Sequence, residues 1–318
     1  MNFLFRRLFD ILPPRIGMAL WRRLRKAGLL RLMDDATFYI CATRAHSGER
    51  FALPKDGGGI NSLINWQRLC WKSDLPVVCS DKIRVRDYVR ARVGDDCLIP
   101  MLPAEGASWD DPDQIDFGRL PDCFVLKLNN GYHMNLVVRG KDNLDIDAVR
   151  RTLRTWLASD DGARCRERQY CAIRNRVYCE KFIGSADGRP PPDYKFMCSD
   201  GKPLFLWVDV DRGPDHRRAV FDPDFNRLPV TIRVPPPDFE IERPGNFARM
   251  VEIASRLSRG IPLVRIDLYS VDDHVYFGEM TFTSGAAKLK FSPFSFSQAM
   301  AAHVDLRPFL EPKEGVKA

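Results

Sequence analysis

Hydrophobic and polar residues alternate over two neighbouring segments near the C-terminus, Leu263–Tyr269 and Val275–Phe282. A period of two residues is typical of β-strands that have one polar and one apolar face. The segment Asp272–His274 between them is polar, which favours a turn. The pattern therefore predicts an antiparallel hairpin, with Arg265 and Asp267 on the polar face of its first strand.

The polar face of this hairpin combines two carboxylates with a cation. Pairing across the turn sets Asp267 opposite Glu279 and Arg265 opposite Thr281. Facing carboxylates beside an arginine suit a hard cation such as Mg²⁺ that holds phosphate oxygens. An ordinary half-buried hairpin with a solvated polar face gives the same alternation, so the pattern alone leaves both interpretations open.

Other segments show the spacing of helices or strands. Apolar residues three or four positions apart predict helices at Ile60–Trp71, from Ser80 or Asp81 to about Gly94, and at Asp145–Ala158, Asn246–Ser258 and Ser292–Ala302. Short apolar or alternating runs predict strands at Phe124–Leu128, Leu136–Arg139, Arg176–Ile183, Asp193–Cys198 and Pro203–Val210. The Gly-rich segment Arg44–Gly59 is expected to be a loop.

The first 32 residues combine large apolar side chains with eight basic residues and one acidic residue, Asp10. Pro13 and Pro14 interrupt the helical spacing, so two short helices are expected. A basic amphipathic segment can lie on an anionic membrane, which would place the protein peripherally on the inner membrane face. The alternative is a helical pair that packs on the protein with its arginines in water.

The chain has 318 residues, of which 45% are hydrophobic and 29% charged, so it is long enough for a substantial core. A net charge of +7, from 49 basic and 42 acidic residues, favours an anionic partner such as a nucleotide, an acidic glycan or a membrane surface. The sequence has no zinc-finger or RNA-binding aromatic motif, and nucleic acid is therefore not expected as a partner.

Nine cysteines are scattered along the chain without a C-x-x-C pair. Their number is odd, and charged residues interrupt the first apolar positions, so no secretory signal is expected. We therefore expect reduced thiols in a cytoplasmic protein. No apolar run reaches the length of a membrane-spanning helix.

A lysine on a predicted strand leads into a small polar loop. Lys127 precedes a segment that contains Asn130 and Gly131, and another strand follows. Such a loop can cover phosphates with its backbone N–H groups, while the lysine supplies a point charge. A plain hairpin is the alternative, since the loop has a single glycine. By spacing alone, Lys82 is a lysine on a helix surface.

Arginines gather in the segment Asp211–Asp222, which follows a predicted core strand and contains Arg212 and Arg217. Guanidinium groups in such a place suit phosphate or carboxylate. The strand end at Glu180–Ile183 is a candidate adenine-binding site. An open strand end offers one backbone N–H and one C=O in line, and these suit the edge of adenine. The alternative there is an ordinary strand with a surface Glu-Lys pair.

Taken in order, these parts resemble the ATP-grasp superfamily. The motifs R-x-D at 265–267 and E-x-T at 279–281, within the wording F-G-E-M-T-F-T-S-G, are similar to the ATP-grasp family named for teichuronopeptide biosynthesis, the TupA-like family. The resemblance covers roughly residues 60 to 285. It implies an α+β ATP-grasp fold, in which two lobes of antiparallel sheet with helices clamp ATP, preceded by an N-terminal helical region.

The resemblance also implies domain boundaries and residue roles. The expected parts are a helical region at 1–80, a first lobe with the hinge at 81–183, a second lobe with the metal site at 184–310, and a tail at 311–318. The nucleotide would be bound by Lys82, Lys127, Asn130, Gly131, Glu180, Lys181, Phe182, Ile183 and Lys195. The metal ligands would be Asp267, Glu279 and Thr281, and the catalytic cations Arg265, Arg212 and Arg217. Thr281 departs from the asparagine that is usual in the superfamily, and its hydroxyl is a poorer metal ligand than an amide oxygen.

The chemistry that the resemblance implies is ATP-dependent ligation, with ATP and Mg²⁺ as cofactors. A carboxylate attacks the γ-phosphate to form an acylphosphate, and an amine then displaces phosphate. The family's link with cell-envelope polysaccharides implies an acidic sugar or an amino acid as the carboxylate substrate. Two alternatives stay open: a kinase-like phosphotransferase that acts on a glycan precursor, and a non-catalytic module that binds a nucleotide or a membrane.

Overall fold

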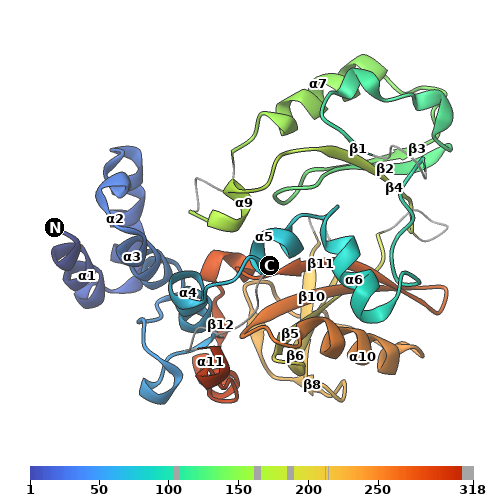
Figure 1. The fold of residues 1–318 in the computed structure, drawn as a ribbon. Helices are drawn as coiled ribbons and strands as arrows, with labels where there is room; N and C mark the ends of the chain where they lie inside the picture. The colour runs from blue at the N-terminus through green and yellow to red at the C-terminus, as the bar shows by residue number, and fades with distance from the viewer. Residues whose placement is uncertain (104–107, 161–165, 185–189, 212, 214, 310–318) are drawn as a thin grey trace.

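The first 93 residues form helices, and two β-sheets make up most of the remaining chain (Figure 1). The computed structural model describes residues 1–103, 108–160, 166–184, 190–211, 213 and 215–309. The tail expected at 311–318 lies outside these residues. Among the helices of the described residues, none combines the length and the apolar character that crossing a membrane requires.

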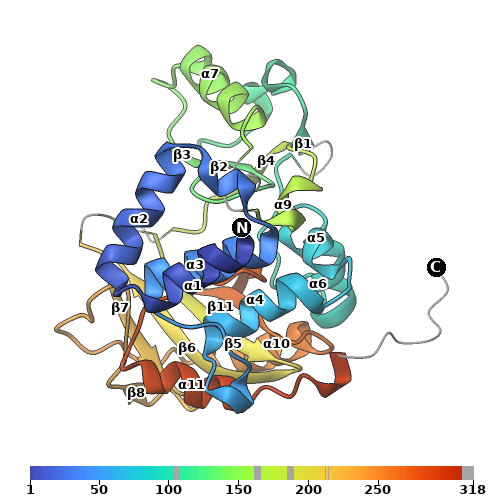
Figure 2. The ribbon, with the colours of Figure 1, turned by 90° about the vertical axis from the view of Figure 1, so that its left-hand side faces the viewer.

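Two helices separated by prolines open the chain, as the sequence predicts. They are α1 (Asn2–Ile11) and α2 (Pro14–Lys26), and both pack against α3 (Asp35–Ser47). Figure 2 shows α1 and α2 on the outer surface of the molecule, on the side that faces the viewer. Phe9 and Trp21 are buried at this contact, with ring centres 6.0 Å apart. The N-terminal helices therefore have a small core of their own.

The helix α3 corrects the prediction that a loop begins at Arg44, because the helix continues to Ser47. Its N-terminus is capped by Asp34, whose carboxylate accepts a hydrogen bond from the Thr37 N–H at 2.7 Å. α3 is buried on most sides and therefore lacks the one-sided apolar spacing that reveals a surface helix. Two further helices follow it, α4 (Ile60–Cys70) and α5 (Leu75–Ser80).

The first sheet has four antiparallel strands in the order β1-β4-β2-β3. The strands are β1 (Ser108–Trp109), β2 (Cys123–Leu128), β3 (Asn135–Arg139) and β4 (Val177–Lys181). The helix α7 (Ile146–Leu157) covers one face, where Phe124, Leu126 and Leu153 are buried together (Figure 1). Alternation along the strands turns Lys127 and Glu180 to the opposite face.

The second sheet has six antiparallel strands in the order β11-β10-β5-β6-β7-β8. The strands are β5 (Asp193–Ser199), β6 (Lys202–Val210), β7 (Arg217–Phe221), β8 (Arg227–Leu228), β10 (Val264–Val271) and β11 (His274–Thr281). The helices α6 (Val85–Val93) and α10 (Phe247–Ser258) pack on one face over Phe196 and Ile266. The other face carries a second core around Phe205 and Trp207 and, beside it, a group of charged residues.

Several shorter elements complete the described chain. They are the helices α9 (Arg168–Cys171) and α11 (Phe294–Ala302), the paired strands β9 (Thr231–Ile232) and β12 (Phe291–Ser292), and 3₁₀ turns at Leu29–Leu32, Pro54–Asp56, Pro112–Gln114, Phe117–Arg119, Ser284–Ala287 and Arg307–Phe309. α11 packs on α4 and on β12, at the end of the second sheet away from α7 (Figures 1 and 2).

The helix α6 packs against the second sheet. Its buried residues Val85, Val89 and Val93 join the core beneath that sheet, although the sequence interpretation placed them in the first lobe. This packing favours a lobe boundary after α6 rather than at residue 80. The other boundaries, at 183 and 310, stay predictions.

The strands β10 and β11 pair as the sequence predicts, with Asp267 opposite Glu279 and Arg265 opposite Thr281. The turn is one residue shorter than expected, because Val271 pairs with His274 across residues 272 and 273. Both turn residues have positive φ, of 50° and 57°, as in the tight turns that match strand twist. A bulge at Gly278 adds one residue back to β11 and restores the predicted register.

Gly278 is tightly enclosed, which makes the bulge testable. A Cβ atom there would lie 3.0 Å from the Asp267 carbonyl oxygen and 3.0 Å from the Tyr269 ring. We expect Gly278→Ala to lower the free energy of unfolding by about 1–3 kcal/mol, as overpacking does. In Gly245→Ala the new Cβ would meet its nearest neighbour, an Asp273 oxygen, at 3.6 Å, so this control should change stability by less than about 0.5 kcal/mol. Denaturant unfolding of both variants is the measurement, and equal stability would contradict the bulge geometry.

Candidate active site

A buried carboxylate lies at the centre of the charged group on the second sheet. Asp267, on β10, is 1% exposed and accepts hydrogen bonds from two cations. The Arg265 guanidinium contacts both of its oxygens, at 2.6 and 2.7 Å. The Lys195 ammonium, from the neighbouring strand β5, donates to Asp267 at 2.5 Å and forms an ion pair with Asp193 at 2.6 Å. Strand register produces this arrangement, since Lys195 is the direct partner of Asp267.

The second carboxylate of the predicted pair is linked to the first through Arg265. Glu279, on β11, accepts from the Arg265 guanidinium at 2.8 Å and from the Thr281 hydroxyl at 2.9 Å. Arg265 also contacts the Thr281 hydroxyl at 3.0 Å. The structure thus brings together Lys195, Arg265, Asp267, Glu279 and Thr281, which we call the charged cluster.

The electrostatics of the charged cluster distinguish its two carboxylates. Burial opposes ionisation of Glu279, but the charges of Lys82, Arg265 and Lys195 outweigh it and lower its pKa to about 2. Burial raises the pKa of Asp267, and the nearby carboxylates act in the same direction. Burial also opposes the charge of Lys195, yet Asp193 and Asp267 raise its pKa. Glu279 is therefore firmly ionised and, with its side chain 35% exposed, is the more accessible of the two.

Lys82 connects the charged cluster with the first sheet. Its ammonium donates to the Gly131 carbonyl at 2.6 Å, and its backbone N–H donates to the Asn129 carbonyl at 3.0 Å. Burial lowers the pKa of Lys82, while the charge of Glu279 acts in the opposite direction. The lysine therefore lies between the loop after β2 and the carboxylate on β11, where a phosphate bound between the two sheets would meet it.

Two predicted nucleotide ligands on the first sheet pair with each other. The Lys127 ammonium donates to Glu180 at 2.5 Å, and Arg86 of α6 lies 3.6 Å from the other Glu180 oxygen. Arg86 belongs to the second-sheet side, so this face of the first sheet is turned toward the charged cluster. Lys181 is exposed at the end of β4, and Phe182, which follows it, lies 5.2 Å from the Arg139 guanidinium. Ile183 comes next in the chain and lies outside any helix or strand.

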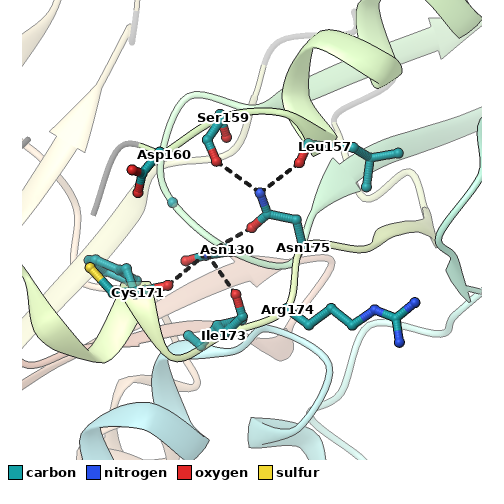
Figure 3. A pocket seen from close by; sticks show the side chains of 10 residues that line it. Asn130, Leu157, Ser159, Asp160, Cys171, Ile173, Arg174 and Asn175 are labelled. Atoms are coloured by element: carbon teal, nitrogen blue, oxygen red, sulfur yellow. Dashed lines mark hydrogen bonds between the residues drawn. The ribbon is translucent and has the colours of Figure 1, made fainter. Parts of the chain in front are cut away.

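The side-chain amide of Asn130 is hydrogen-bonded to neighbouring protein groups (Figure 3). Its amide donates to the Asn175 side chain at 2.8 Å and to the Tyr170 carbonyl at 2.9 Å, and Asn175 in turn donates to the carbonyls of Leu157 and Ser159. A pocket of about 320 Å³ borders these residues. The hydrogen bonds fix the end of the loop, so the part of Asn130 in the predicted nucleotide site would be to position Gly131 rather than to contact phosphate.

Of the two catalytic arginines predicted after β6, the structure describes Arg217, and it does not bring Arg217 to the charged cluster. Arg212 lies outside the described residues. Arg217 pairs with Val210, which packs on the opposite face of the sheet, over the core beneath α10. Its neighbour Arg218 faces the charged cluster instead and binds Asp209 through two contacts, at 2.6 and 3.0 Å. The strand alternation of β7 turns the two arginines to opposite faces of the sheet, and the sequence analysis predicted no strand in this segment.

Sequence reasoning missed a group of residues around α9. The Tyr170 side chain is half-buried. Loss of water around the phenol, and then the charges of Glu167 and Glu279, raise its pKa, which indicates that it lies close to the charged cluster. Gln169 donates to the Thr283 hydroxyl at 2.9 Å, and that hydroxyl donates to Glu167. No periodic apolar pattern marks this short helix in the sequence.

One arginine next to α9 fastens the first-sheet part to the N-terminal helices. The Arg166 guanidinium donates to the carbonyls of Leu30 and Met33, each at 2.8 Å, and to the Asp35 carboxylate at 3.0 Å. The Tyr39 hydroxyl donates back to the Arg166 carbonyl at 2.7 Å. Segments far apart in the sequence are thus joined beside the charged cluster.

The oxygen atoms of the charged cluster fit the preferences of Mg²⁺. Carboxylate and hydroxyl oxygens from Asp267, Glu279 and Thr281 are hard donors. In the part of the chain that the structure describes, no three His, Cys, Asp or Glu side chains converge as a metal-binding group. Two carboxylates suffice for Mg²⁺ where substrate phosphates and water complete its octahedral shell. The donor set therefore suits a metal that arrives with a nucleotide better than a structural metal.

The two antiparallel sheets, with cations and carboxylates on their facing sides, define a protein of the ATP-grasp class. The sequence profile of the TupA-like ATP-grasp family matches residues 63–304, and the chain belongs to this family. The membership confirms the predicted α+β ATP-grasp fold. It agrees with the predicted enzyme class, a ligase, and with ATP and Mg²⁺ as cofactors. Among curated proteins, no sequence matches the chain.

Solved ATP-grasp structures resemble the chain more distantly. An L-amino acid ligase from Bacillus licheniformis has 14% identity and a TM-score of 0.46, with 83% of this chain and 58% of that chain covered. A D-alanine–D-alanine ligase from Helicobacter pylori has 12% identity and a TM-score of 0.43, with coverages of 79% and 68%. The ATP-grasp ligase PsnB, complexed with a minimal precursor, has 12% identity and a TM-score of 0.39, with coverages of 70% and 58%. The chain thus spans little more than half of two of these relatives, and similarity at this level carries no argument about function.

The low pKa of Glu279 leads to a prediction about stability and pH. The pKa is about 2 in the folded protein and about 4.5 in the unfolded chain, so ionised Glu279 stabilises the fold above pH 4.5. That contribution disappears as the pH falls through the interval from 4.5 to 2. Glu279→Gln removes this stabilising contribution. We therefore expect the melting temperature of the variant to fall less between pH 6 and pH 3 than that of the wild type. Thermal unfolding at several pH values is the measurement.

The matched control is Glu240→Gln, which replaces an exposed carboxylate. Its melting temperature should follow the wild type across the same pH range. A Glu279→Gln profile that coincides with that of the wild type would contradict the charge pairing of Glu279.

Proposed function

We propose that this protein is an ATP-dependent carboxylate–amine ligase that acts through an acylphosphate. Family membership supports the ATP-grasp chemistry. The observation that carries the proposal is the charged cluster, in which Asp267 and Glu279 lie on paired strands and Arg265 bridges them. Lys195 binds Asp267 from the strand on its other side, β5. Oxygen donors for a metal and cations for phosphate occur there side by side, as phosphoryl transfer requires.

The reaction has two steps. A carboxylate oxygen of the substrate bonds to the γ-phosphorus of ATP while the bond to the β–γ bridging oxygen breaks, which yields ADP and an acylphosphate. The nitrogen of an amine then bonds to the acyl carbon, phosphate leaves, and the nitrogen loses its proton. Neither step needs a covalent bond to the protein, so alignment and charge stabilisation are what the side chains contribute.

Individual residues of this chain fit those two tasks. Arg265 is held by Asp267 and Glu279 and would stabilise the charge that develops on the transferred phosphoryl group. Lys82, Lys127 and Lys195 would contact the phosphates. Asp267, Glu279 and the Thr281 hydroxyl would hold Mg²⁺, which supplies charge neutralisation on the phosphates when bound. Their oxygens already accept from Arg265 and Lys195, so Mg²⁺ and these cations would share them.

The substrates and the biological role extend the proposal further. The wording around Glu279 resembles a family associated with cell-envelope polysaccharides, and an acidic sugar or an amino acid is therefore proposed as the carboxylate, with a small amine as acceptor. A kinase-like transfer of phosphate to a glycan precursor would use the same residues. The two reactions differ in product mass, since ligation gives an amide without phosphorus.

Glu279→Gln tests the catalytic proposal. We expect ATP-dependent turnover to fall by about 100-fold or more, because the amide has no charge with which to hold Mg²⁺ or orient Arg265. The fold should persist, since the Glu279 side chain is 35% exposed. Phosphate release in the presence of carboxylate and amine mixtures is the measurement, with mass spectrometry of the products. Glu240→Gln is the control and should keep wild-type turnover; a fully active Glu279→Gln enzyme would refute the role of the charged cluster.

We also propose that the N-terminal helices attach the protein to an anionic membrane. Trp21 is buried against Phe9 and Phe38 within the helical region, which accounts for one apolar side chain of the segment. On the outer side of α1, by contrast, apolar side chains are exposed to solvent: Leu4 is 69% exposed and Ile11 is 76% exposed. The exposed apolar residues of the segment are Met1, Phe3, Leu4, Leu8, Ile11, Ile16, Leu29 and Leu32.

Charge complementarity supports an anionic bilayer as the partner of this surface. Eight basic residues and one acidic residue lie in the first 32 positions. Each basic side chain near an anionic lipid surface contributes about 1 kcal/mol, and inserted apolar side chains add to this. The sum gives reversible attachment, which salt should weaken.

Leu4→Glu combined with Leu8→Glu tests the attachment without shortening the chain. We expect the wild type to sediment with vesicles that contain phosphatidylserine at low salt, and to be released at high salt or from phosphatidylcholine alone. The double variant should lose most of this binding while keeping its melting temperature. Phe239→Glu, at a residue 47% exposed outside the N-terminal helices, should bind like the wild type. A wild type that ignores anionic vesicles at low salt, or a double variant that still sediments, would refute the membrane proposal.

A further inference from the structure

A second pocket, of about 160 Å³, lies between the N-terminal helices and the charged cluster. Its walls come from four separate parts of the chain: α3 and α4, the start of α5, the helix α9, and the residues that follow β11. The charged residues on its walls are Arg68 and Arg168, and its aromatic residues are Tyr39, Trp71 and Phe282. The pocket is about as large as a cavity that accepts a benzene ring, so it fits one six-membered ring or a small amino acid.

The pocket adjoins the charged cluster along two chain segments. Phe282 and Thr283 are the first residues after Thr281, which places them within about 7 Å of it along an extended chain. On the other side, Gln169 lines the pocket, while the next residue, Tyr170, is half-buried and close enough to Glu279 for that charge to raise its pKa. A molecule in this pocket would therefore lie beside the groups proposed to carry out phosphoryl transfer.

The polar side of the pocket has an excess of positive charge. The Arg68 guanidinium lies over the Tyr39 ring, 3.8 Å from its centre, and this cation–π contact holds it at that wall. Three arginines, Arg68, Arg166 and Arg168, gather here, and the Asp35 carboxylate contacts both Arg166 and Arg168. Glu167 is a second carboxylate here; it is buried and accepts a hydrogen bond from Thr283, and burial raises its pKa. Among these described residues the three arginines outnumber the two carboxylates, which favours an anionic ligand.

The apolar side of the pocket suits the body of such a ligand. The Trp71 and Phe282 rings are stacked, with centres 6.3 Å apart and planes inclined by 21°. Both rings line the pocket, and a sugar ring or an aliphatic chain packs well against aromatic side chains. Gln169 and Thr283 are already bonded to each other at 2.9 Å, so the polar atoms of this wall are fixed in place.

We infer that this pocket binds a carboxylate-bearing substrate of the ligation, with its anionic group on Arg68 and its body on Trp71 and Phe282. The inference rests on the proposed ligase function, because it takes the pocket as the neighbour of a phosphoryl-transfer centre. It narrows the substrate class to small organic anions with a ring or a short aliphatic body. The same geometry assigns to the N-terminal helices a part in substrate recognition, since α3 and α4 supply Tyr39 and Arg68.

Two variants separate the contributions of charge and space. Arg68→Gln removes the guanidinium charge, and Ser73→Trp places an indole at an exposed residue on the pocket wall. Lys72→Trp is the matched control for the second, because it adds the same bulk at the neighbouring exposed position, which is not part of the wall. Calorimetric titration of the full chain with D-glucuronate, L-glutamate and benzoate, and with benzyl alcohol as a neutral probe, is the measurement.

We expect at least one carboxylate probe to bind the wild type and Lys72→Trp alike. Its affinity should fall at least about 10-fold in Arg68→Gln, as loss of a charge-assisted contact does. Ser73→Trp should lose binding of the carboxylate probe. Benzyl alcohol should not compete with that probe in the wild type or in any variant. The inference is wrong if none of the carboxylates binds the wild type, or if binding survives in Ser73→Trp or in Arg68→Gln.

Nucleotide binding, measured separately with a fluorescent ATP analogue and Mg²⁺, distinguishes this failure from failure of the ligase proposal. The three variants lie outside the charged cluster, and their nucleotide affinity should equal that of the wild type. Loss of nucleotide binding in one variant alone shows a damaged fold, and the remaining variant then decides the question about the pocket. Absence of nucleotide binding in the wild type would refute the ligase, whatever the carboxylate probes do.

Discussion

The structure around the active site depends on how the buried carboxylate of Asp267 is neutralised. An ionised group that leaves water loses several kcal/mol of hydration, and only close opposite charges compensate for it. Arg265 and Lys195 do so from the same strand and from the adjacent one, at 2.5–2.7 Å. This requirement fixes β10 between β5 and β11, because a shift by one residue would turn Asp267 into the apolar core beneath the sheet. The sheet register and the chemistry of the site are thus set by the same three side chains.

The sequence was sufficient to predict the polar face of the hairpin, but not the details that produce it. The expected register at Asp267 and Glu279 is correct even though the turn has one residue fewer than predicted. The bulge at Gly278 offsets that difference, and bulges leave no trace in an alternating pattern apart from the glycine itself. Alternation is informative here because one face of the strands is buried and the other is charged.

Other parts could not be predicted because their signals are spatial. Arg217 and Arg218 are neighbours in sequence, and deciding which of them faces the charged cluster requires knowing that they lie on a strand, β7, which the sequence analysis did not predict. α3 lacks one-sided spacing since neighbours cover it on most sides. The short helix with Tyr170 approaches Glu279 only in the folded chain, and the two residues are far apart in sequence, so no local pattern predicts their proximity.

The attachment of Arg166 to the N-terminal helices has a consequence for how the two sheets move relative to each other. Arg166 precedes α9 and holds Leu30, Met33 and Asp35 with three hydrogen bonds. The first sheet is also joined to the rest through its covalent connections at the far end of β4 (Figure 1). A body fastened at two separated points can swing only about the line that joins them. As long as these bonds persist, rotation about that line is the relative motion left to the first sheet.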